Sequence, residues 1–229
     1  MPGRWERVFS SWKSAAGSIA MKRIGMATKL KKKGAELATA PSYGIVEEVD
    51  MAVAFPYVWA KSEGNGATIS HENGFSDVLF TAKWRLFEKD GIGLALKPGI
   101  TLPTGNHKRE LGSGRATYSV TFIATKELEP FTFHINGGYT RNENKLEEKK
   151  DLWAASFAPE VKLGKDTRIV GEARMSKNTD YSCGTDHAFT SVGINYALTE
   201  KIDINLGYKA GLNEAEPDHT LLAGITVRL

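Results

Sequence analysis

The chain has 229 residues, with 30 Lys and Arg, 27 Asp and Glu, 23 Gly and a single Cys. One cysteine excludes an internal disulfide and also excludes metal sites built from several thiolates. No apolar run reaches the roughly 18–20 residues that a membrane-spanning helix needs. The mean hydropathy of −0.31 is typical of a soluble protein, but strands of membrane barrels show only every second residue to lipid and also average out as polar. Composition therefore leaves a soluble β protein and an outer-membrane barrel as alternatives.

Basic residues are concentrated at the N-terminus. Residues 1–33 hold nine Lys and Arg and one acid, whereas the rest of the chain holds 21 basic and 26 acidic residues. The segment lacks the continuous apolar stretch of about 7–15 residues found in signal peptides. Three interpretations stay open: a start downstream of the true signal, a fragment, or a basic arm for nucleic acid or anionic lipid. Because isolated Lys runs usually form solvated loop tips, we expect no nucleic-acid partner and treat 1–16 as a separate basic segment.

From residue 34 onward, apolar and polar residues alternate. The alternation is clear at 115–124, 131–140 and 201–212. Residues two apart share one face of a strand but would scatter around a helix. The chain is therefore predicted to be all-β, with one apolar and one polar face on each strand.

The predicted strands are separated by links of alternating length. They lie near 35–45, 48–61, 75–88, 91–103, 114–126, 130–141, 151–163, 167–177, 187–198, 201–212 and 218–229. Tight links lie at 46–48, 89–91, 127–129, 164–166 and 199–200, and longer polar links lie at 62–74, 104–113, 142–150, 178–186 and 213–217. This alternation places the tight turns at one end of an up-and-down meander and the long loops at the other, as in outer-membrane barrels.

A twelfth strand is expected because bacterial single-chain barrels have even strand numbers. We place it within roughly 17–30, joined to the next strand by a loop at Lys31–Gly34. The predicted fold is an all-β, up-and-down antiparallel transmembrane β-barrel of about 12 strands, forming a single domain over 17–229. Pro98 and Pro159 fall inside predicted strands, where the missing backbone N–H should interrupt the ladder.

The content of the two faces indicates which one points inward. The apolar face carries Trp and Tyr near strand ends, where the aromatic girdles of membrane barrels lie, and the polar face carries charges of both signs. We therefore assign the polar face to a hydrated lumen. The candidate lumen-lining residues are Lys83, Arg85, Lys97, Arg115, His134, Asn136, Glu160, Lys162, Glu172, Arg174, Asn205 and Lys209. Four of them, Glu160, Lys162, Glu172 and Arg174, are predicted to form a cross-strand ion network.

Several stretches resemble a family of outer-membrane proteins named for the MetA pathway of phenol degradation. The matching segments are YGIVEEVDMAVAFPYVW at 43–59, GFSDVLFTAKWRLFEKDG at 74–91, LKPGITLPTGN at 96–106, LGSGRATYS at 111–119 and LGYKAGLNEAEPDHTLLAGITVRL at 206–229. The resemblance covers about 35–229. It implies an outer-membrane barrel of about a dozen strands that passes small hydrophobic or aromatic compounds, and it supplies no catalytic residues.

No motif in the sequence predicts a catalytic, metal or cofactor site. The five His residues lack metal-ligand spacing, and the Gly-x-Gly runs do not lie between a strand and a helix. A hydrolase would need Ser, His and a polar residue that orients the His, all close together; His134 with Ser119 is the one conceivable pair. We therefore expect no enzyme, no metal and no cofactor.

The sequence thus predicts a passive channel for small solutes in the bacterial outer membrane. Its expected partners are membrane lipid, small-molecule solutes and the outer-membrane assembly machinery. About 12 strands should leave a narrow lumen, and the loops 62–74, 104–113 and 142–150 are long enough to close over its mouth. The alternatives are a structural or ligand-binding barrel with a plugged lumen and a soluble β-barrel.

Overall fold

The computed structural model describes residues 16–24, 30–64 and 67–228. Its side chains are described from Gly34 to Lys61 and from His71 to Arg228. Of the predicted basic segment 1–16, only Ala16 lies within the described residues.

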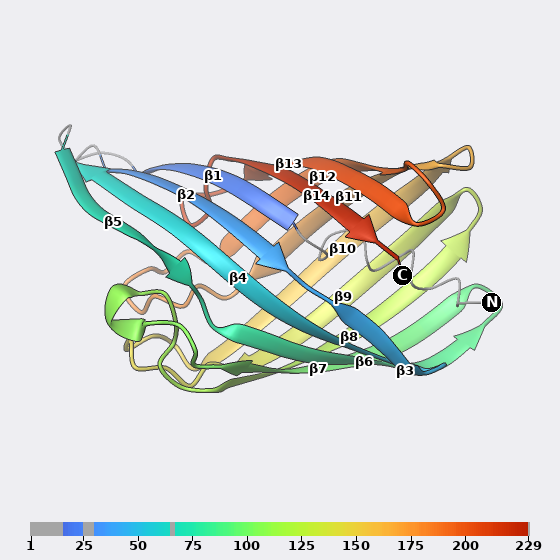
Figure 1. Ribbon diagram of the computed structural model, residues 1–229, viewed down its shortest axis with the longest axis horizontal. Coiled ribbons are helices and arrows are strands. Elements are labelled where there is room, and N and C mark those ends of the chain that lie inside the picture. Colours follow the sequence, from blue (N-terminus) through green and yellow to red (C-terminus); the bar gives the residue numbers. More distant parts are fainter. Residues whose placement is uncertain (1–15, 25–29, 65–66, 229) are drawn as a thin grey trace.

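Alternating residues produce strands almost everywhere in the described chain (Figure 1). The strands are β1 (Ala16–Ile24), β2 (Leu30–Thr39), β3 (Ser42–Val46), β4 (Val49–Gly64), β5 (Ala67–Phe75), β6 (Val78–Lys89), β7 (Ile92–Leu102), β8 (Thr117–Leu128), β9 (Phe131–Arg141), β10 (Asp151–Leu163), β11 (Thr167–Ser176), β12 (His187–Ala197), β13 (Ile202–Gly211) and β14 (His219–Val227). One 3₁₀ helix, His107–Arg109, lies between β7 and β8. No helix in the described ranges is long and apolar enough to cross a membrane.

The strands close into a barrel. From β6 to β14 each strand pairs with the next one along the chain, and β14 pairs with β1, β1 with β2, and β2 with β4, all antiparallel. β4 also pairs with β3, β5 and β6. Hence β2 and β3 together occupy one strand position of the barrel, which we call a stave, and this stave is interrupted near Pro41. In the same way β5 and β6 form a second stave, which is interrupted at Ser76 and Asp77. The fourteen strands of the described chain make twelve staves, which confirms the predicted fold.

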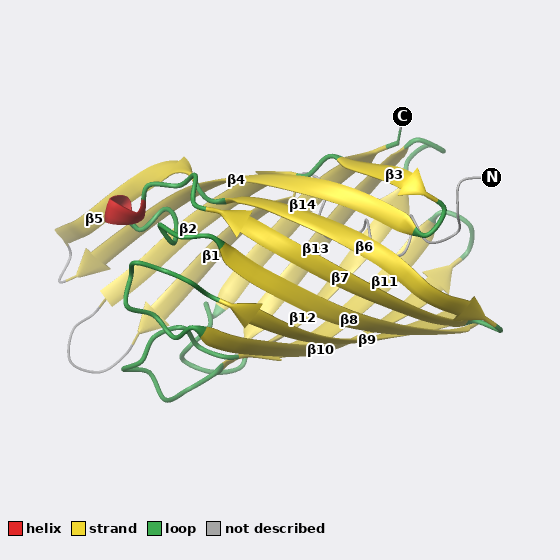
Figure 2. Cartoon of the chain, turned by 90° about the horizontal axis from the view of Figure 1, so that it is seen from below, coloured by secondary structure: helices red, strands yellow, loops and turns green. Residues whose placement is uncertain are grey.

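The two ends of the barrel differ as predicted. Tight turns follow β3, β6, β8, β10 and β12, and longer loops follow β7, β9, β11 and β13. We call these the turn end and the loop end. In Figure 2 the long loops gather at one end of the barrel, where β5 and the short helix also lie.

Two predicted loops are strands instead. Residues 62–64 form the end of β4, residues 67–74 form most of β5, and Lys31–Gly34 lies inside β2. Neither segment has a clear apolar alternation. Both segments are strands because their backbones are hydrogen-bonded in the ladders between β2 and β4 and between β4 and β5. Backbone hydrogen bonds do not require apolar side chains. The predicted first strand agrees with β1, which begins at Ala16.

The two strand prolines interrupt the ladder as predicted. The pairing of β10 with β11 runs from Phe157↔Ala173 to Glu160↔Val170 and skips Pro159. The pairing of β6 with β7 likewise skips from Thr81↔Gly99 to Trp84↔Leu96, across Pro98. The missing N–H is the physical reason.

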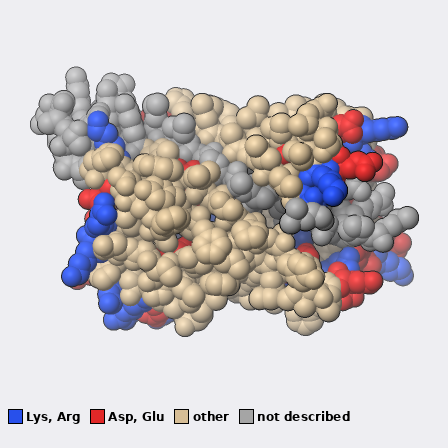
Figure 3. Space-filling model, viewed as in Figure 1, with Lys and Arg blue, Asp and Glu red and all other residues tan. Residues whose placement is uncertain are grey.

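Large apolar side chains cover the outside of the barrel. Leu206 is 57% exposed and Ile135 60%, fractions that would be costly in water for so many side chains together. Exposed aromatic residues lie near the loop end of their strands at Trp59, Tyr118, Tyr139, Trp153 and Tyr208, and near the turn end at Trp84, Phe131 and Tyr196. Figure 3 shows charged side chains at both ends and almost none across the middle of this face.

Polar side chains fill the inside. The buried polar residues on the barrel strands are Thr117, Thr125, His134, Ser156, Glu160, Ser191, Asn195, Asp203, Thr220 and Thr226. The few buried apolar strand residues are Ala95, Ile123 and Val170. A soluble barrel has the opposite arrangement, with its apolar face inward. The polarity of the two faces therefore argues against the soluble alternative.

Candidate functional site

The inner wall of the barrel holds most of the predicted lumen residues. Lys83 and Arg85 lie on β6, Lys97 on β7, His134 and Asn136 on β9, Glu160 and Lys162 on β10, Glu172 and Arg174 on β11, and Asn205 and Lys209 on β13. Strand register places them on one face: Asn136 lies opposite Ser156, Glu172 opposite Ser191, and Asn195 opposite Asn205. This face is the interior, because Ser156, Ser191 and Asn195 are buried.

Arg115 is the exception. It was predicted on a strand, but β8 begins at Thr117, and Arg115 is exposed in the loop 103–116. Its backbone carbonyl oxygen lies 2.6 Å from the Ser113 hydroxyl oxygen. The glycines before Arg115 hold the chain in a turn, so the apparent alternation at 114–116 does not extend the strand.

The predicted four-residue ion network is replaced by a smaller pair. Glu160 lies 3.7 Å from Arg168, a residue that the prediction omitted. Glu160 is 7% exposed and the Arg168 side chain 17%, so both charges are largely withdrawn from water. The two-residue period of a strand would by itself have placed Arg168 inside the barrel, because Arg168 lies two residues before Val170 and four before Glu172 on β11.

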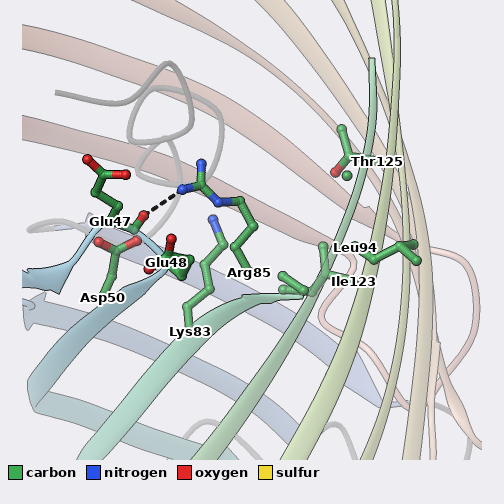
Figure 4. A pocket seen from close by; sticks show the side chains of 10 residues that line it. Glu47, Glu48, Asp50, Lys83, Arg85, Leu94, Ile123 and Thr125 are labelled. Atoms are coloured by element: carbon green, nitrogen blue, oxygen red, sulfur yellow. Dashed lines mark hydrogen bonds between the residues drawn. The ribbon is translucent and has the colours of Figure 1, made fainter. Parts of the chain in front are cut away.

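A narrow cavity opens inside the barrel toward the turn end (Figure 4). Glu47, Glu48 and Asp50 line one side, and Lys83 and Arg85 extend from β6 beside them. Asp50 lies opposite Lys83 in the ladder, and Arg85 donates to the Glu47 carbonyl and to the Glu88 carboxylate, both at 2.7 Å. The remaining wall is formed by small and apolar residues and one hydroxyl: Gly93, Leu94, Ala95, Ile123 and Thr125. The cavity thus presents both charge signs beside an apolar surface.

The loops at the other end are bonded to one another in series. The Lys145 N–H donates to the Ser113 carbonyl at 2.8 Å, which joins the loop 103–116 to the loop 142–150. The Lys149 N–H donates to the Thr179 carbonyl at 2.8 Å, and Asn213 donates to the Asp186 carbonyl at 2.8 Å. These bonds link four successive loops. We call this series the loop collar.

Carboxylates within the collar have perturbed acidity. The Asn178 N–H and then the Lys177 ammonium hold the pKa of Asp186 below its usual range. The Lys177 Nζ atom lies 3.2 Å from an Asp186 oxygen. The Arg141 guanidinium, with a smaller contribution from Lys150, lowers the pKa of Glu143.

We expect the loop 177–186 to loosen in acid. A carboxyl group with a lowered folded-state pKa stabilises the fold above its unfolded pKa, near 4 for aspartate, and loses this contribution as the pH falls through the lowered value. Pepsin cleavage in this loop should therefore accelerate between about pH 4 and pH 2, relative to a free peptide of the same sequence. Asp186→Asn should already be cleaved faster at pH 5 and should respond less to acid. An identical pH response in both proteins would contradict this assignment.

Neither the Ser119 and His134 pair nor a metal-binding group is formed by the described residues. His134 is buried and its Nδ1 lies 2.9 Å from the Thr125 hydroxyl, whereas Ser119 lies opposite Thr140 and Gly99, farther along the strands. The conceivable Ser119 and His134 pair is therefore not brought together. Among the described His, Cys, Asp and Glu side chains, no group of three or more could hold a metal ion.

A closed barrel with an apolar exterior and a polar interior defines the class of outer-membrane β-barrels. Comparison with solved structures agrees. An outer membrane channel from Pseudomonas putida F1 superposes with a TM-score of 0.71 at 14% identity, over 95% of this chain and 96% of that one. The KdgM porin gives 0.58 at 9% identity, over 93% and 99%. The NanC porin gives 0.57 at 10% identity, over 94% and 100%.

The family is shown by sequence. The model of the family described as "Putative MetA-pathway of phenol degradation" matches residues 37–229, and the chain belongs to this family. The match confirms the resemblance seen in the sequence segments. Comparison with curated protein sequences gave no match.

Proposed function

We propose that the chain is a passive channel of the bacterial outer membrane for small, weakly polar solutes, with no enzymatic step. The observation that carries the proposal is the pairing of an apolar belt outside with a continuous polar and charged wall inside a closed barrel. Such a wall can solvate a passing solute, whereas the belt is suited to lipid. The family's link to phenol degradation and the channels among the similar structures support the same function.

The size of the barrel favours small solutes. A strand spacing of ~4.8 Å and a tilt of ~40° give twelve staves a backbone diameter of roughly 24 Å. Inward side chains from both walls occupy much of this width. Both signs of charge line the interior, so ion selectivity should be weak. The apolar part of the turn-end cavity, formed by the inward side chains of Ala95 and Ile123, suits hydrophobic or aromatic groups.

Planar-bilayer recording of the refolded protein tests this proposal. We expect small, discrete conductance steps with little preference for cation or anion, because charges of both signs are present. Liposome swelling should be faster with phenol-sized solutes than with disaccharides. Heat-modifiable gel mobility would establish, in the same samples, that the barrel is folded.

The rival function is a structural or ligand-binding barrel with a plugged lumen. It is favoured by the strong burial of interior residues such as Thr125, His134 and Asn195. Folded protein that inserts into bilayers but gives neither conductance nor swelling would support this rival.

Recognition of the chain by the outer-membrane assembly machinery is also part of the proposal. The last strand, β14, has the alternating pattern of such barrels, in which the apolar residues Leu221, Ala223, Ile225 and Val227 alternate with inward residues.

A further inference from the structure

The break between β5 and β6 meets both halves of the distant loop 103–116. At this meeting point is Asp77, which is 8% exposed. One carboxylate oxygen accepts the Gly105 N–H at 2.8 Å. The other accepts both the N–H and the hydroxyl of Ser113 at 2.7 Å. All three donors belong to the loop 103–116, so one buried carboxylate holds both halves of this loop.

Two glycines permit this close approach. A Cβ atom at Gly105 would lie 2.3 Å from the Leu111 carbonyl oxygen, and one at Gly112 would lie 2.2 Å from an Asp77 oxygen. Both distances are shorter than any normal contact, so a side chain at either position would displace the loop or the carboxylate. The segments GFSD, LPTG and LGSGR, noted above for their family resemblance, therefore form one structural unit.

The loop packs against the inside of the barrel wall. Gly74 on β5 lies opposite Val58 on β4, and Phe55 and Trp59, which belong to the other face of β4, are exposed on the outside. Gly74 therefore faces inward. A Cβ atom there would lie 2.9 Å from the Leu111 side chain, and Leu111 is buried. The loop 103–116 thus covers the interior face of β5.

A second contact on the same face supports this placement. Glu72 lies two residues before Gly74 on β5, and its carboxylate accepts from the Arg109 guanidinium at 2.6 Å. In Figure 2 the short helix that contains Arg109 lies beside β5 at the loop end. The loop is fixed on its other side by the Lys145 N–H bond to the Ser113 carbonyl.

We propose that the loop 103–116 is a fixed constriction at the loop end of the solute path, and that Asp77 is the residue that positions it. The inference rests on the proposed channel function. It differs from a mobile gate, because the loop is hydrogen-bonded to Asp77 and Glu72, packs against Gly74, and is bonded to the loop collar through Ser113. A buried carboxylate with three donors is costly to release.

Asp77→Asn tests the positioning role. An amide group cannot accept at both ends, so at least one loop N–H loses its acceptor and the loop should move off the wall. We expect single-channel conductance to rise roughly two-fold or more, with added current noise, because the constriction widens. Ser113→Ala, which removes only the hydroxyl bond, should give a smaller increase. Lys165→Gln, a change at an exposed residue in the turn between β10 and β11, is the control and should leave conductance unchanged.

A reversible tether separates positioning from general destabilisation. Glu72→Cys with Arg109→Cys, in a Cys183→Ser background, can be joined by a short reducible bis-maleimide, which would tie the loop to β5 at the point where Glu72 and Arg109 meet. In the Asp77→Asn protein the intact tether should restore wild-type conductance, and reduction should abolish the rescue. The proposal is overturned if Asp77→Asn leaves conductance unchanged, or if the tether forms without restoring it. A tether that closes the channel in otherwise wild-type protein would indicate a mobile gate instead.

The same variants distinguish failure of this inference from failure of the proposed function. If folded wild-type protein gives no conductance, the channel function fails. Trypsin cleavage at Lys108 and Arg109 then tests Asp77 alone. We expect slow cleavage in the wild-type protein and cleavage about ten-fold faster in Asp77→Asn, since cleavage of an ordered loop follows its opening. Equal rates would overturn the positioning role.

Discussion

Replacement of Arg168 by methionine is expected to destabilise the barrel by about 3–5 kcal/mol, because it leaves a buried carboxylate without its charged partner. Glu160 is 7% exposed and lies 3.7 Å from the guanidinium of Arg168. In the two adjoining ladders Glu160 lies opposite Val170 and Thr132, and neither of these residues carries a positive charge. Equilibrium unfolding in urea, followed by tryptophan fluorescence of protein refolded into lipid vesicles, measures the change.

Two variants make this result specific. The double variant Glu160→Gln with Arg168→Met should recover much of the lost stability, since removing both charges avoids the uncompensated one. Arg174→Met is the matched control: Arg174 lies on the same face of β11 but is exposed, so its loss should cost no more than about 0.5 kcal/mol. Equal losses for Arg168→Met and Arg174→Met would show that the pair contributes nothing particular.

Replacement of Leu206 by arginine is expected to cost about 2–4 kcal/mol, because a guanidinium near the bilayer midplane loses its hydration. Leu206 lies in the middle of β13 and is 57% exposed on the outer face. The experiment is the same unfolding titration in vesicles, with the fraction of inserted protein measured in parallel.

Thr132→Arg is the matched control for the opposite face. Thr132 lies between Glu160 on β10 and Glu127 on β8 in the two ladders, on the interior side. A new guanidinium there meets two carboxylates and should be tolerated or slightly stabilising. Similar penalties for Leu206→Arg and Thr132→Arg would contradict the assignment of the outer and inner faces.

Most of the fold was predictable from the sequence, because apolar residues that face lipid alternate with polar residues that face the interior along each barrel strand. The stretches around Phe131 to Arg141 and Ile202 to Gly211 alternate without interruption, so both their type and their faces were predicted. Prediction failed where the alternation stops. The segment 62–74 has no apolar alternation, yet residues 67–74 form a strand because their backbone pairs with β4.

The candidate site was predictable only in part. Parity placed eleven lumen residues on the inner face but could not select their partners. Glu160 pairs with Arg168, near it in the ladder, and not with Arg174. Asp77 was not singled out as a functional residue at all, since a lone aspartate in a turn has many uses. Its role depends on Gly105 and Ser113, which lie 28 and 36 residues away in the chain.

By itself, therefore, the sequence determined the strand type, the up-and-down order, the short and long ends and the polarity of each face. These are local properties, because alternation and turn composition are set by neighbouring residues. Only the tertiary structure decided the closure of β1 on β14, the pairing of individual charges, and the folding of the loop 103–116 onto the inner wall. Each of these depends on register and on close approach between distant segments, where a shift of one residue or one added Cβ atom changes the contact.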